Sequence, residues 1–146
     1  MGLRIYDSNV NIVSFCKDDK NYAATIAWAA QVGYDYIVLL LGSQSNTGTA
    51  IEKGDIIGIS VLNRNQKDIA SFIGETHSSD VDKFKNLVLN EYHKAYTLKN
   101  AVYEIYAEVI DILHLKEIED DKLVYVKVLK YTKNNGEYLR MGDFDE

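Results

Sequence analysis

The residues best suited to chemistry in this sequence gather in one short loop. Five polar residues stand between two glycines, directly after an apolar run: Ser43, Gln44, Ser45, Asn46 and Thr47. Hydroxyl groups beside the first amides of a helix suit an anion such as a phosphate. The alternative is a plain polar loop in which Thr47 caps a helix that runs to Glu52 and is stopped by Gly54.

The remaining side chains form no familiar catalytic motif. The sequence has no GxSxG, no GxxxxGK[ST] and no GxGxxG. Cys16 is the single cysteine, so an internal disulfide and a cysteine-based zinc site are excluded, and we expect a small buried side chain. His77, His93 and His114 lie far apart and are expected at the surface. Acidic residues fall mostly in turns or at outward strand positions, so no catalytic pair of carboxylates can be placed.

Length and charge restrict the class of protein. A chain of 146 residues, 47% hydrophobic and 26% charged, predicts a single globular domain over residues 1–146. The net charge of −6 repels phosphodiester backbones, so we expect no nucleic-acid partner. The longest apolar run, residues 36–41, is too short to cross a bilayer, and the N-terminus lacks the apolar core of a secretion signal. We therefore expect a cytoplasmic protein with no membrane partner.

Short apolar and β-branched runs predict a mainly β fold. Strands are expected over residues 10–16, 24–29, 36–41, 55–62, 103–109 and 123–129. The continuous apolar run 36–41 predicts a strand buried on both faces. A helix is expected over residues 65–74, because Ile69, Phe72 and Ile73 share one face and Gly74 can end it. Many short strands with a few short helices indicate a small β-barrel with helical insertions.

The last residues predict a hairpin and a tail. Asn134, Asn135 and Gly136 are typical of a tight hairpin turn. The acidic residues that follow, within about 141–146, are expected to fray.

Several segments, taken in order, resemble the flavin reductase-like, FMN-binding split-barrel family. Residues 21–32 resemble the family's N-x-x-T-x-S-W…Q-V-S segment, and residues 45–55 resemble its S-x-T-x-x-x-I-x-x-G-x-F element. Residues 59–74 resemble V-N-V-L…Q…L-A…F-G, residues 81–84 the D-K-F that follows, and residues 103–129 the paired strands that end the barrel. Their shared order and spacing make the resemblance.

The chain departs from the family pattern at a few positions. Ala27 stands where the family has serine, Tyr22 where it has asparagine with Asn21 one residue away, and Ser60 where it has asparagine. Asp120, Asp121 and Lys122 replace a Gly-Asp-His common in the last hairpin.

The resemblance implies a mainly β, antiparallel split barrel with a few short helices. It implies a homodimer that binds FMN, or alternatively FAD, near the dimer interface. Residues 25–28 would line the flavin, Ser45 and Thr47 would hold the phosphate, residues 60–62 would offer backbone groups, and Lys83 would add charge. The implied cofactor-binding residues are Asn21, Thr25, Ile26, Ala27, Trp28, Ser43, Ser45, Asn46, Thr47, Ser60, Val61, Leu62 and Lys83.

The function implied by the resemblance is that of a flavin reductase, in which hydride moves from NAD(P)H to the flavin. The cofactor carries that chemistry, which accounts for the lack of an acid–base motif. The alternatives are a non-enzymatic FMN electron carrier that serves a redox partner protein, an FMN-free interaction module, and a barrel like pyridoxamine-phosphate oxidase. Tyr34 and Tyr36 are expected either to contribute to the dimer interface or to pack inside their own subunit.

Overall fold

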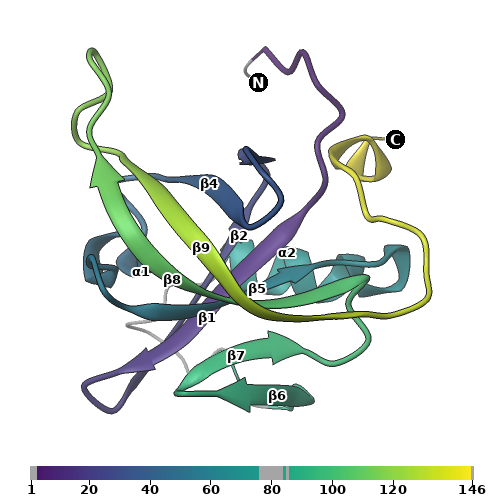
Figure 1. Cartoon of the computed structure of the whole chain (residues 1–146). Helices are drawn as coiled ribbons and strands as arrows, with labels where there is room; N and C mark the ends of the chain where they lie inside the picture. Colours follow the sequence, from purple (N-terminus) through teal and green to yellow (C-terminus); the bar gives the residue numbers. More distant parts are fainter. Residues whose placement is uncertain (1–2, 76–83, 85, 146) are drawn as a thin grey trace.

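The computed structural model describes residues 3–75, 84 and 86–145, and its centre is a closed antiparallel barrel (Figure 1). Its strands are β1 (Asn11–Lys17), β2 (Lys20–Ile26), β3 (Ala29–Gln31), β4 (Tyr36–Leu41), β5 (Ile56–Val61), β8 (Tyr103–Leu113) and β9 (Lys122–Lys133). The pairs β1–β2, β3–β4, β4–β9, β9–β8, β8–β5 and β5–β1 are all antiparallel. The ring closes because the chain passes from β2 to β3 through Ala27 and Trp28 and changes its partner from β1 to β4. The mainly β prediction is confirmed.

Alternate positions of these strands fill the barrel. The inward set includes Val13 and Phe15 of β1, Ala24 and Ile26 of β2, Leu39 and Leu41 of β4, Ile57 and Ile59 of β5, Ile105, Ala107 and Val109 of β8, and Val124 and Val126 of β9. This period of two is what a sheet with one buried face requires. The expectation that β4 is buried on both faces is wrong, because Leu39 and Leu41 are fully buried whereas Ile37, Val38 and Leu40 are partly exposed.

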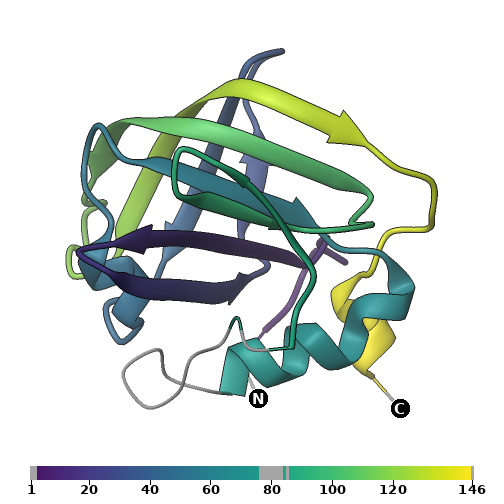
Figure 2. The ribbon, with the colours of Figure 1, turned by 90° about the horizontal axis from the view of Figure 1, so that it is seen from below.

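A second core lies outside the barrel, between the barrel and helix α2 (Lys67–Glu75). Figure 2 shows this helix running along the outside of the barrel. Ala70 and Ile73 of α2 are buried there with Ile12, Leu62 and Leu98. The predicted helix begins two residues later than expected, because a 3₁₀ turn, η1 (Arg64–Gln66), precedes it. Gly74 lies within the helix instead of ending it.

A hairpin that the sequence did not predict crosses the outside of the barrel. It consists of β6 (Leu89–Tyr92) and β7 (Ala95–Leu98), and β7 passes over β5 at Gly58. A β-carbon at Gly58 would lie 1.8 Å from the carbonyl oxygen of Tyr96, so only glycine allows this approach.

The same hairpin is tied to β8 by a buried acid. Glu104 is 4% exposed and accepts hydrogen bonds from Asn90 (2.6 Å), Thr97 (2.9 Å) and Asn134 (2.6 Å). The expectation that strand carboxylates point outward is therefore wrong at Glu104, since three neutral donors satisfy this one in the interior.

The two chain ends lie together, and the C-terminal expectations were wrong (Figure 2). Gly136, with φ +137°, does not close a hairpin; the chain crosses instead to Tyr138, which bridges to Asn63. Residues up to 145 are fixed rather than frayed: η2 (Met141–Phe144) follows, Asp7 accepts from the Gly142 amide at 2.7 Å, and Arg4 pairs with Asp145.

The contact at Gly58 gives a stability prediction. Gly58→Ala is expected to lower the free energy of unfolding by about 3 kcal/mol, because the Tyr96 backbone cannot yield cheaply. Gly42→Ala is the control, since the nearest atom to a β-carbon there is 4.0 Å away, and its change is expected to stay within about 1 kcal/mol. Urea unfolding of both variants checks this, and equal stabilities would refute the close-packing argument.

Candidate functional site

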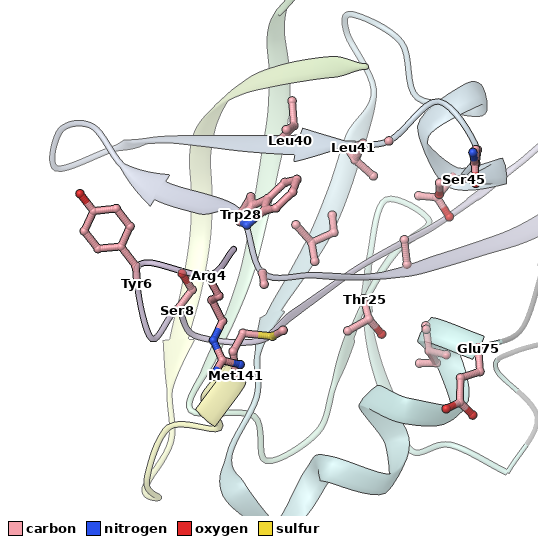
Figure 3. Close-up of a pocket in the computed structure, with 18 of the residues that line it drawn as sticks. Arg4, Tyr6, Ser8, Thr25, Trp28, Leu40, Leu41, Ser45, Glu75 and Met141 are labelled. Carbon is pink, nitrogen blue, oxygen red and sulfur yellow. The ribbon is translucent and has the colours of Figure 1, made fainter. Parts of the chain in front are cut away.

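An open cleft of about 1040 Å³ lies at the interruption between β2 and β3 (Figure 3). Five parts of the chain line it: the end of β2 with the interruption, the end of β4 with the loop into helix α1 (Asn46–Ala50), the end of α2, the N-terminal part and the C-terminal part. The lining residues are Leu3, Arg4, Tyr6, Ser8, Ala24, Thr25, Ile26, Ala27, Trp28, Leu40, Leu41, Gly42, Gln44, Ser45, Asn46, Thr47, Ile73, Gly74, Glu75, Met141 and Asp145. The cleft therefore combines an apolar wall with a cluster of hydroxyl and amide groups.

The structure brings seven of the predicted site residues to this cleft: Thr25, Ile26, Ala27, Trp28, Ser45, Asn46 and Thr47. Trp28 is 68% exposed and lies beside Leu40, whose amide donates to the Trp28 carbonyl at 2.9 Å (Figure 3). The Thr25 hydroxyl donates to the Ala70 carbonyl at 2.8 Å, so it ties β2 to α2. The first predicted segment thus forms a wall whose backbone and hydroxyl positions are fixed.

The turn into α1 is capped by Ser45, not by Thr47. The Ser45 hydroxyl accepts from the Gly48 amide at 3.2 Å, and the helix ends at Ala50 rather than Glu52. The expected cap was two residues late, because the residue whose hydroxyl reaches the third helical amide is Ser45. A β-carbon at Gly48 would lie 2.7 Å from the Gly42 carbonyl oxygen, so glycine lets the loop fold tightly onto itself.

Thr47 carries the most informative atom of the site. The residue is 1% exposed and lines the cleft, yet its Oγ1 has no hydrogen-bond partner among the residues that the structure describes. A buried hydroxyl without a partner costs free energy that folding alone does not repay. Its place in the cleft fits a ligand oxygen that would complete the missing hydrogen bond.

Five predicted residues lie outside the cleft: Asn21, Ser43, Ser60, Val61 and Leu62. The amide of Ser43 donates to Asp121 at 2.9 Å, on the other side of the loop. The hydroxyl of Ser60 accepts from the Leu98 amide at 2.8 Å.

Residues 60–62 do not line this cleft, and β5 runs between β1 and β8. The Leu62 amide donates to Val10 at 3.0 Å, and its carbonyl accepts from Leu139 at 2.9 Å. Lys83 lies outside the described residues.

The described residues that line the cleft carry one positive and two negative charges. Arg4 is the one cation among the described lining residues, and it pairs with Asp145. The hydrogen bond that Arg4 donates to Asp145 raises the pKa of Arg4, so the guanidinium stays charged. Glu75 adds a carboxylate at the end of α2 (Figure 3).

The terminal residues of the cleft, such as Arg4 and Asp145, were not predicted from the sequence. The one feature of the sequence that could have indicated them is that the two residues have opposite charges. They lie at opposite ends of the chain, however, so no spacing pattern pairs them. Within the described ranges, no group of three or more His, Cys, Asp or Glu side chains could hold a metal ion. In the same part of the chain, no helix is long and apolar enough to span a membrane.

The family model of the flavin reductase like domain matches residues 3–143. The chain belongs to this family. The predicted resemblance is confirmed, and it extends beyond the segments from which it was first inferred. The comparison with curated protein sequences gave no match.

Solved structures with the same fold include proteins of different described activity. The NADH:FAD oxidoreductase SgcE6 of Streptomyces globisporus superposes with a TM-score of 0.78 at 15% identity, covering 88% of this chain and 76% of that one. An FMN-binding protein from Thermus thermophilus gives 0.80 at 16% identity, covering 91% and 75%. Flavoredoxin from Methanosarcina acetivorans gives 0.80 at 12% identity, covering 99% and 80%. At these identities the similarity shows a shared fold, and the split barrel predicted from the sequence is confirmed.

The different roles of Ser45 and Thr47 give a prediction for stability. Ser45→Ala removes the helix cap and is expected to lower the free energy of unfolding by about 1 kcal/mol. Thr47→Val removes a hydroxyl that has no partner among the described residues, so the free energy of unfolding is expected to stay unchanged or to rise by up to about 1 kcal/mol. Thermal unfolding of the flavin-free protein checks both. A clear loss of stability in Thr47→Val would show that its hydroxyl serves the fold.

Proposed function

We propose that the cleft binds FMN and that the protein is a flavin reductase, accepting hydride from NAD(P)H. The observation that carries the proposal is Thr47, a residue that lines the cleft and whose buried hydroxyl has no described partner. An interaction module without a ligand would gain nothing from this hydroxyl. The family membership and the flavin-related names of its structural neighbours support the proposal.

The residues present fit a flavin in their chemistry. Ile26, Trp28 and Leu40 give the cleft an apolar wall suited to a flat ring system, and the exposed indole of Trp28 offers a surface for stacking. A volume of about 1040 Å³ in an open cleft exceeds the need of one mononucleotide. This volume also allows FAD as the alternative flavin, and FAD is the flavin in the name of the Streptomyces globisporus neighbour.

The phosphate end would be held mainly by neutral donors. Thr47 Oγ1 is the donor that the fold leaves available, and Ser45 and Asn46 stand beside it at the start of α1. Arg4 is engaged by Asp145, so its charge is already compensated. The part of Lys83 in binding the phosphate stays a prediction.

A bound flavin supplies the hydride-accepting chemistry, so the protein needs no acid–base pair of its own. The chain's residues bind the ring against β2 and the interruption, fix the phosphate on α1, and shield one side of the site with the two chain termini. NAD(P)H would approach from the open side of the cleft.

A second function is an FMN electron carrier reduced by a partner protein. The observation that favours it is the similarity to flavoredoxin over 99% of this chain. In this reading, electrons reach the flavin from a redox partner rather than from NAD(P)H. The cytoplasmic location expected from the sequence stays a prediction.

Flavin titration tests the site. FMN fluorescence is expected to be quenched on addition of the protein, and Thr47→Val is expected to weaken FMN by about 1–2 kcal/mol, or about five- to thirtyfold. Riboflavin lacks the phosphate, so its affinity is expected to stay the same in Thr47→Val. Equal FMN affinities of the two proteins would contradict the role of Thr47, and no quenching by the unmodified protein would contradict the site.

Turnover separates the two functions. The purified protein with FMN is expected to oxidise NADH or NADPH, measured as loss of the absorbance of the reduced nicotinamide. Flavin binding with no such loss, but with reduction of the flavin by a redox partner protein, would contradict the reductase and support the carrier.

We further propose that a second copy of the chain covers the surface beside the cleft. All of β3 is exposed, and Trp28, Val32 and Tyr34 are 68%, 53% and 98% exposed next to it. Tyr36 instead stacks on Tyr125 of its own chain, with ring centroids 5.5 Å apart. Tyr34 and Tyr36 therefore have different environments. Exposed apolar groups gathered in this way are typical of an interface.

Tyr34→Ser is therefore expected to shift the protein from dimer toward monomer and to weaken FMN binding at the same time. Val88→Ser removes another exposed apolar side chain, on the segment before β6, and is expected to change neither. Size-exclusion chromatography with light scattering, run beside an FMN titration, measures both properties. A monomeric Tyr34→Ser protein with full FMN affinity would contradict the link between dimer and site.

A further inference from the structure

Helix α1 is too short to be stable by itself. It has five residues, Asn46–Ala50, and these include Gly48 and two threonines, which are poor helix formers. A helix of this length is not stable in water without tertiary contacts. Something outside α1 must therefore fix the direction in which Thr47 points.

Two lysines from distant strands hold the far end of α1. Lys122, the first residue of β9, donates from Nζ to the carbonyl oxygens of Ile51 at 2.8 Å and Thr49 at 3.3 Å. Lys17, the last residue of β1, donates from Nζ to the Ala50 carbonyl at 2.9 Å. Three successive carbonyls at the C-terminal end of α1 thus accept hydrogen bonds from two ammonium groups.

Both lysines suit this position electrostatically. The last carbonyls of a helix carry partial negative charge and have no acceptor role within the helix, so ammonium groups stabilise them. Lys17 also pairs with Asp55 at 2.9 Å and with Glu52. Burial lowers the pKa of Lys17, but its hydrogen bonds to Glu52 and Asp55 outweigh this, and the net pKa is raised.

We propose that Lys122 and Lys17 are positioning residues for the phosphate end of the flavin. They hold the C-terminal carbonyls of α1, and α1 in turn presents Ser45 and Thr47 to the cleft. Neither lysine lines the cleft, so they act through the helix and not by contact with the ligand. The inference rests on the proposed flavin site and assigns residues that contribute to its affinity from outside it.

Lys122→Met tests the inference with the least disturbance, because the Nζ of Lys122 bonds to carbonyls of this helix end whereas Lys17 also holds two carboxylates. The variant is expected to lose about three- to tenfold in FMN affinity and to change by less than about twofold toward riboflavin. The control is Lys127→Met, the same change at an exposed position of the same strand, which is expected to keep both affinities.

The outcomes are distinct. An unchanged FMN affinity in Lys122→Met, or an equal loss for FMN and riboflavin, would overturn the positioning role. Failure of the unmodified protein to bind FMN in the same titration would instead overturn the proposed function on which this role rests.

Hydrogen exchange gives a second readout that needs no flavin. The amides of Thr49 and Ile51 donate within α1, to Ser45 at 3.0 Å and Thr47 at 3.1 Å. Their exchange is expected to accelerate in Lys122→Met and to stay unchanged in Lys127→Met, and equal rates in both variants would overturn the inference. If Lys122→Met does not fold, Lys122→Gln, which keeps a shorter polar end, is measured in its place with the same expectations.

Discussion

The whole arrangement depends on how the barrel closes. β2 pairs with β1, β3 pairs with β4, and the two residues between them, Ala27 and Trp28, carry the chain from one partner to the other. The hydrogen bond from the Leu40 amide to the Trp28 carbonyl, 2.9 Å long, continues the ladder across this interruption. Since a continuous strand would seal the barrel side, the interruption is also what leaves a cleft between β2, β4 and α2. Closure and site are thus two results of one local break in a strand.

On the opposite side of the cleft, helix α1 contains a feature that does not stabilise the fold. A short helix with a glycine and two threonines is held by a serine cap, a close glycine contact and two lysines, yet it leaves the Thr47 hydroxyl buried without a described partner. Unsatisfied groups of this kind persist where binding, rather than folding, uses them. In the flavin site that we propose, the neutral donors of α1 and the compensated Arg4 would hold a phosphate by hydrogen bonds more than by net charge.

The strand pattern made most of the barrel predictable, because one buried face imposes a period of two on each strand. The loop before α1 was also predicted from the sequence, because hydroxyl groups beside the first amides of a helix suit an anion wherever they occur in a fold. What could not be predicted depends on contacts between distant segments. The β6–β7 hairpin lies on β5 only because Gly58 admits the Tyr96 carbonyl, and that hairpin supplies two of the three donors that satisfy the buried Glu104. Residues 60–62 matched a family segment, but their place in the middle of a sheet, which a linear motif does not record, keeps them from the cleft.

The central claim is that the flavin lies between the interruption after β2 and the start of α1. Two-dimensional NMR of the ¹⁵N-labelled protein, with and without FMN, tests it most directly. The amide signals of residues 25–28 and 45–48 are expected to shift on addition of FMN, whereas those of residues 60–62 are expected to stay in place. Shifts centred on residues 60–62, with residues 45–48 unaffected, would contradict it.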